Sequence, residues 1–157
     1  ASATTCAFPN SSGNTSRPAA EAAEGHAELL SAQLPTIAGI PVLDMAILGM
    51  GADGHTASLF PGTSDAARQD IVLATVQPES GEERISLGIP VLNAATEVRF
   101  LVTGAQKADT MARLFNETGF QNGADSLPAG KIRPRSGNLL WYVDDAAGNL
   151  LPPTPFD

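Results

Sequence analysis

Apolar residues along this chain occur in two patterns, one with helical spacing and one of short continuous runs. Ala22, His26, Leu29 and Leu30 fall on one face at helical spacing, which predicts a helix that ends near Leu34. Short apolar runs bounded by glycine, proline or polar residues predict strands at 42–48, 71–76, 84–89, 98–102 and 139–143. Shorter helical segments are expected at 92–95, 105–116 and 144–147. Strands that alternate with helices indicate an α/β fold, with a mostly parallel sheet covered on both faces.

The segment from residue 43 to residue 62 predicts a strand, a glycine-rich turn and the first turns of a helix. Its glycines stand at 49, 51 and 54. Strand ends that lead into glycine-rich helix starts are where open α/β sheets bind ligands, and a helix N-terminus favours an anion. The spacing matches neither the dinucleotide fingerprint nor a nucleotide-triphosphate loop. We therefore expect Gly51 and Gly54 to face a ligand, the alternative being that they only form a sharp turn.

His55 follows this turn and is one of two histidines in the chain. Imidazole has a reference pKa of about 6.5, and the expected helix N-terminus disfavours its charged form. A neutral ring suits a general base, although a structural histidine is the alternative. Asp53 either orients the ring, caps the helix, or does neither, and it is also a candidate substrate-binding residue.

Residues 53–62, Asp-Gly-His-Thr-Ala-Ser-Leu-Phe-Pro-Gly, follow Leu-Gly-Met-Gly at 48–51. Together they resemble the signature of the 6-phosphogluconolactonases. Further blocks that resemble this family follow in order at 84–95, 102–108, 127–129 and 139–144. The resemblance implies a three-layer α/β/α fold. It also implies hydrolysis of 6-phospho-D-glucono-1,5-lactone to 6-phosphogluconate in the pentose phosphate pathway, without a metal or an organic cofactor.

The chemistry of ester hydrolysis and, for Lys107, the resemblance suggest roles for particular residues. His55 would take a proton from the attacking water and return one to the departing ring oxygen. Backbone N–H groups of the glycine loop, or a nearby cation, would stabilise the oxyanion. Lys107, and as a further candidate Arg133, would hold the phosphate or carboxylate end of the substrate. Without the resemblance, either side chain reads equally well as solvated.

Two other functions remain open. Glucosamine-6-phosphate deaminases share the Gly-x-Gly-x-Asp-Gly-His core, but they carry Asn-Glu-Pro where this chain has Ser-Leu-Phe-Pro at 58–61. An isomerase or deaminase of that kind is therefore the weaker alternative. A sugar-phosphate-binding domain without catalytic activity is the other.

Full-length members of the family are longer on the N-terminal side, where they resemble one another in a glycine- and serine-rich loop and an Asp-Glu-Arg segment. Neither is found in this chain of 157 residues. We expect residues 1–157 to form a single domain, the C-terminal portion of a lactonase domain. Within it, residues 1–15 and 148–157 are expected to be irregular.

Charge and composition limit the classes of partner and ligand that this chain is expected to bind. The net charge of −8 disfavours nucleic acid and means that a phosphosugar lactone needs a locally positive site. Two distant histidines and a single cysteine give little support for a metal site. No apolar run approaches the length of a membrane span and no signal peptide is visible, so no membrane partner and a cytoplasmic location are expected. The oligomeric state is left open.

Overall fold

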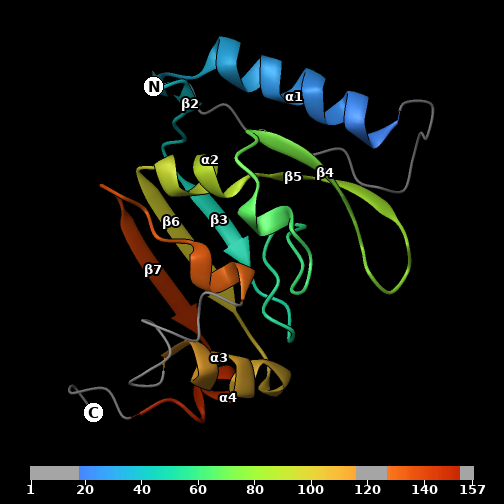
Figure 1. Cartoon of the computed structure of the whole chain (residues 1–157). Helices are drawn as coiled ribbons and strands as arrows, with labels where there is room; N and C mark the ends of the chain where they lie inside the picture. The colour runs from blue at the N-terminus through green and yellow to red at the C-terminus, as the bar shows by residue number, and fades with distance from the viewer. Residues whose placement is uncertain (1–17, 116–126, 153–157) are drawn as a thin grey trace.

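The computed structural model describes residues 18–115 and 127–152 of the chain (Figure 1). Its helices are α1 (Ala19–Gln33), η1 (Asp65–Ala67), α2 (Ile89–Ala94), η2 (Ala105–Lys107), α3 (Ala108–Phe115), η5 (Pro128–Lys131) and α4 (Asp145–Gly148), where η marks a 3₁₀-helix. Its strands are β1 (Thr36–Ile37), β2 (Ile40–Pro41), β3 (Ala46–Gly49), β4 (Val72–Val76), β5 (Glu83–Leu87), β6 (Glu97–Val102) and β7 (Asn138–Val143). Each strand predicted from the apolar runs is therefore present, with ends that differ by a few residues. The irregular segment expected at 1–15 lies outside the described residues.

The centre of the fold is a parallel sheet with the strand order β3-β6-β7. On one face of β6, Val98, Phe100 and Val102 are almost fully buried. Phe100 stacks on Trp141 of the neighbouring strand, with the two ring centroids 3.9 Å apart. This alternation of buried and exposed positions follows from the period of two along a strand.

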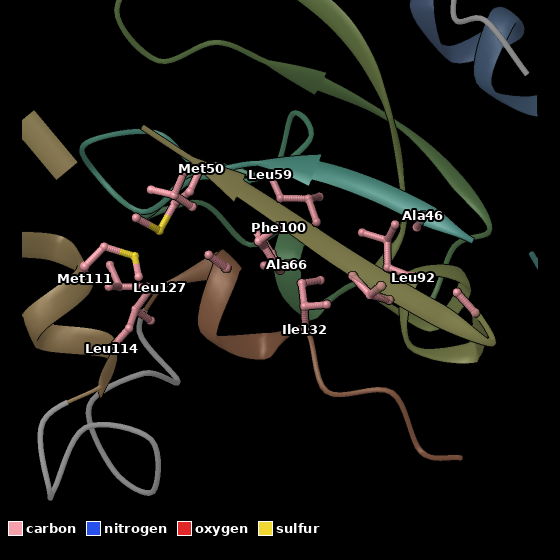
Figure 2. Packing of buried hydrophobic residues seen from close by; sticks show 14 of the residues in the cluster. Ala46, Met50, Leu59, Ala66, Leu92, Phe100, Met111, Leu114, Leu127 and Ile132 are labelled. Atoms are coloured by element: carbon pink, nitrogen blue, oxygen red, sulfur yellow. The ribbon is translucent and has the colours of Figure 1, made fainter. Parts of the chain in front are cut away.

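The main hydrophobic core lies against this face of the sheet (Figure 2). Leu92 comes from α2, Met111 and Leu114 from α3, and Ile132 from the residue after η5. Leu59, from the segment after β3, is fully buried in the same cluster. The core thus fixes the segments that follow β3 and β6 onto one side of the sheet.

The opposite face of the parallel sheet is exposed in the described part of the chain. Ile47 of β3, Leu101 of β6, and Leu140 and Tyr142 of β7 are between 41% and 63% exposed. The register places Leu101 beside Tyr142, so their side chains share one face. Parallel sheets normally carry helices on both faces. The described residues provide that cover on one face.

Strands β4 and β5 form a separate antiparallel hairpin, which α1 covers (Figure 1). Ala23 and Leu30 of α1 pack with Val72 of β4 in a second, smaller core. His26 is half-buried on this helix, which confirms the helical segment that its spacing predicted. No helix in the described residues is long and apolar enough to cross a membrane.

The helix predicted after Asp53 is wrong. Residues 52–62 form successive tight turns, with an isolated bridge between Thr56 and Leu59. Ala57 has a φ of 51°, a left-handed conformation that interrupts a right-handed helix. The buried Thr56 hydroxyl donates to the Gly49 carbonyl at 2.9 Å, which folds the chain back onto the end of β3. These local conformations replace the helix N-terminus that the sequence led us to expect beside His55.

Two neighbouring residues of β6 test the assignment of the two sheet faces. Phe100→Ala should lower the free energy of unfolding by about 3–5 kcal/mol, because it leaves a cavity in the core. The matched variant Leu101→Ala removes an exposed side chain and should cost less than about 1 kcal/mol. Urea unfolding of the two variants measures both values. Equal losses would contradict the buried and exposed assignment.

Candidate active site

The loop after β3 is closed by its own backbone. The Gly51 N–H donates to the His55 carbonyl at 2.9 Å, and the Gly54 N–H donates to the Gly51 carbonyl at 3.0 Å. Gly54 has a φ of 87°, which a residue with a Cβ rarely adopts. The His55 N–H donates to a carboxylate oxygen of Asp53 at 3.1 Å. These three N–H groups are occupied, so this conformation does not provide them as the oxyanion donors that were expected.

His55 and Asp53 form the central pair of this loop. Nδ1 of His55 lies 2.7 Å from Oδ1 of Asp53, the same oxygen that accepts the His55 backbone N–H. The two side chains are 37% and 52% exposed. Burial raises the pKa of Asp53, but the hydrogen bonds from His55 outweigh burial and hold that pKa below its ordinary value. Asp53 is therefore a carboxylate at neutral pH, and it contacts the imidazole directly.

This contact replaces the physical argument that the sequence suggested for His55. With no helix at residues 55–60, the ring does not lie at the N-terminus of a helix that its own segment forms. A carboxylate that accepts from Nδ1–H leaves Nε2 of the neutral ring as the free acceptor. The carboxylate also stabilises the positive charge that develops when Nε2 takes a proton. The pair thus has the arrangement of a general base with an orienting carboxylate.

Gly51 makes room for this pair. A Cβ at this position would lie 2.1 Å from Nδ1 of His55 and 2.4 Å from Oδ1 of Asp53. Both distances are far below van der Waals contact, so a larger residue would displace the imidazole or the carboxylate. The role expected for Gly51 was close approach to a ligand. The structure shows a close approach of two side chains of the chain itself.

A hollow of about 330 Å³ lies beside this pair and is lined by Gly49, Met50, Gly51, His55, Ala57 and Lys107. Its walls come from the loop after β3 and from η2, which follows β6. Because β3 and β6 are parallel neighbours, their carboxyl ends meet at the same edge of the sheet. The structure therefore brings His55 and Lys107 to one site, although they are far apart in the sequence.

The sequence matches a known protein family. Residues 3–141 match the family of glucosamine-6-phosphate isomerases and 6-phosphogluconolactonase. The chain belongs to this family. The human 6-phosphogluconolactonase is 38% identical over 146 residues, which are 92% of this chain and 54% of that protein. The rat enzyme is 40% identical over 120 residues, 75% of this chain and 44% of that protein. The chain thus spans about half the length of these relatives.

Solved structures show the same fold. The crystal structure of the devB protein is 40% identical, with a TM-score of 0.74 over 83% of this chain and 53% of that one. The 6-phosphogluconolactonase from Trypanosoma brucei is 27% identical, with a TM-score of 0.71 over 83% of this chain and 52% of that one. A monomeric glucosamine-6-phosphate deaminase is 19% identical, with a TM-score of 0.59, and shows the fold alone. These similarities confirm the three-layer α/β/α fold that the sequence predicted for this chain.

The other residues that the sequence predicted for the site do not line the hollow. Gly54 packs closely against the Leu127 side chain, which a Cβ at this position would approach to 2.9 Å. Arg133 follows η5, and its Nε donates to the Gly130 carbonyl at 3.1 Å. Its backbone N–H donates to the Asn93 side chain of α2. The structure therefore gathers Gly51, His55 and Lys107 at the hollow and places Arg133 beside α2 and η5.

Two threonines that the sequence did not single out hold the loop in place. Thr56 donates to the Gly49 carbonyl, and Thr110 of α3 donates to the Ala52 carbonyl. Both side chains are almost fully buried. Thr56 is next to His55 in the sequence, and this position could have marked it as a residue of the site. Thr110 lies 58 residues from Ala52, and nothing in the sequence connects the two.

Gly51→Ala should separate His55 from Asp53, because the added methyl occupies the space between them. We expect the pKa of Asp53 to rise towards its ordinary value once the hydrogen bonds from His55 are lost. The control is Gly49→Ala, whose Cβ meets nothing within 4 Å. NMR titration of the Asp53 carboxyl carbon measures the pKa in both variants. An unchanged Asp53 pKa in folded Gly51→Ala would show that the pair tolerates the methyl group.

The lowered pKa of Asp53 also predicts how stability depends on pH. A carboxyl whose pKa is lower in the folded state stabilises the fold above its unfolded pKa of about 3.9, and this stabilisation disappears as the pH falls through the folded pKa. Asp53→Asn should therefore be less stable than the unmutated chain at pH 7, by at most about 1 kcal/mol because exposed pairs are screened. The difference should vanish near pH 2. Urea unfolding at both pH values measures it, and a difference that grew at low pH would contradict this sign.

Proposed function

We propose that this protein hydrolyses 6-phospho-D-glucono-1,5-lactone to 6-phosphogluconate, and that this chain carries the general base, His55. The observation that supports the proposal is the contact of His55 with Asp53, together with the hollow that His55 and Lys107 line. The similar human and rat proteins are named 6-phosphogluconolactonase. The proposal includes a cytoplasmic location and a phosphosugar lactone as the small-molecule partner.

The first step is attack of water on the lactone carbonyl. Asp53 accepts from Nδ1–H of His55, so Nε2 of the neutral ring is the acceptor. Nε2 takes a proton from the water while its oxygen forms a bond to the carbonyl carbon. The product of this step is a tetrahedral intermediate with a negative oxygen, and the imidazolium is stabilised by the Asp53 carboxylate.

The second step breaks the ring. The tetrahedral intermediate collapses, the bond from the carbonyl carbon to the ring oxygen breaks, and that oxygen takes the proton from Nε2 of His55. The imidazole is neutral again, and one water has been added across the ester bond. The resulting carboxylic acid ionises in solution near neutral pH.

Lys107 provides positive charge on the lining of the hollow that also contains the base. It forms no ion pair within residues 18–115 and 127–152, so its ammonium is available to an anion. In a chain with a net charge of −8, such a local cation is needed to attract a sugar phosphate. We assign Lys107 to the phosphate or carboxylate end of the substrate. Arg133 does not line the hollow, so the proposal depends on Lys107.

His55→Gln should lower kcat for the lactone by about a hundredfold or more in the whole protein, since glutamine cannot act as a base. Circular dichroism verifies that the variant is folded. A clearly smaller loss in a folded variant would contradict the assignment of the base. Release of ammonia from glucosamine-6-phosphate by the unmutated protein, without lactone hydrolysis, would favour a deaminase instead.

Lys107→Ala should chiefly raise KM, by about 10- to 100-fold, because a charged hydrogen bond to the substrate is lost. The matched control is Lys131→Ala, which removes a lysine that does not line the hollow and should leave KM unchanged. Initial-rate kinetics on the lactone measures both constants. If Lys107→Ala and Lys131→Ala behaved alike, Lys107 would be a solvated side chain with no role in binding.

A further inference from the structure

The loop that carries Asp53 and His55 accepts hydrogen bonds from several elements of the fold. The Gly49 carbonyl accepts from the Thr56 hydroxyl at 2.9 Å and closes the base of the loop. The Gly54 carbonyl accepts from the Ala129 N–H of η5 at 3.1 Å. The Ala52 carbonyl accepts from the Thr110 hydroxyl of α3. The last of these contacts connects the loop to the helix that begins directly after Lys107.

Thr110 is buried, and its hydroxyl has an unusual hydrogen-bond partner for a threonine within a helix. Its side chain is 3% exposed although the Ala52 residue that it reaches lies at the surface. A threonine inside a helix commonly donates to the carbonyl four residues earlier in the same helix. Here the hydroxyl instead donates across 58 residues of sequence. Lys107 and Thr110 are three residues apart in the continuous η2–α3 segment, so they lie on the same side of it.

We propose that Thr110 is a positioning residue that sets the place of the Asp53–His55 pair relative to Lys107. Its hydroxyl holds the peptide group between Ala52 and Asp53, directly before the carboxylate that orients the imidazole. When Lys107 binds one end of the substrate, the distance from that anchor to Nε2 of His55 decides whether the base reaches the attacking water. The inference rests on the proposed hydrolase function for its kinetic consequences, and on geometry alone for its structural ones.

Thr110→Val tests the proposal because valine has nearly the shape of threonine without the hydroxyl. We expect kcat for the lactone to fall by about tenfold and KM to stay within about twofold, because a misplaced base affects the chemical step more than substrate binding. Thr110→Ser keeps the hydroxyl and should restore most of the kcat. The matched control is Thr75→Val, since Thr75 is also 3% exposed but its hydroxyl has no hydrogen-bond partner in the described structure. Thr75→Val should leave kcat unchanged.

NMR titration of the Asp53 carboxyl gives a readout that does not depend on activity. In Thr110→Val the freed loop should weaken the contact with His55, and the pKa of Asp53 should rise; in Thr75→Val it should not. If the unmutated protein hydrolyses no lactone, the proposed function fails and this titration alone decides the role of Thr110. Should Thr110→Val not fold, Thr110→Ala is compared with Thr110→Ser in the same two measurements. A folded variant without the hydroxyl that keeps both kcat and the Asp53 pKa, and loses only stability, would overturn the proposal.

Discussion

The hydrogen bond of 2.7 Å between Nδ1 of His55 and Asp53 is the contact on which the proposed chemistry of this chain depends. An imidazole in a loop can rotate and can carry its proton on either nitrogen. A carboxylate at Nδ1 fixes both the orientation and the tautomer, and it leaves Nε2 available to a water molecule. The loop can hold this pair only because Gly51 has no side chain between the two groups. The glycine-rich segment thus makes room for the imidazole–carboxylate contact, whereas the sequence pattern had suggested an anion-binding turn at the start of a helix.

The parallel sheet turns this local pair into a site. β3 and β6 run side by side in the same direction, so the segments that follow them emerge at one edge. The first carries His55 and the second carries Lys107. Buried side chains such as Phe100 and Met111 hold the strands and α3 together beneath them. The separation between His55 and Lys107 is therefore set by core packing and by hydrogen bonds between segments that are distant in the sequence. It does not follow from the order of residues along the chain.

The two faces of the sheet differ in what they contact. One face packs on α2, α3 and η5, while the other leaves Ile47, Leu101 and Tyr142 about half exposed or more. Burial of apolar surface supplies most of the free energy that stabilises a fold, so a parallel sheet with one open face is only partly stabilised by these residues. The chain also spans about half the length of the curated relatives that it matches. The two observations are related, because the three-layer fold of the family has helices on both faces of its sheet.

The sequence by itself determined the five longer strands, most helices and the family, because neighbouring residues carry the apolar periodicity and the ordered local motifs. It also singled out His55 and Lys107 as candidate site residues, and the structure places both at one hollow. It did not reveal the short strands β1 and β2. It was wrong about the helix after Asp53, since the left-handed Ala57 and the hydrogen bond from Thr56 to Gly49 become visible only in three dimensions. Only the tertiary structure decided that Asp53 binds the imidazole, that Lys107 shares its hollow, that Arg133 does not line it, and that Thr110 reaches the loop. Each of these depends on distances between segments far apart in the chain, which packing sets and local sequence patterns do not encode.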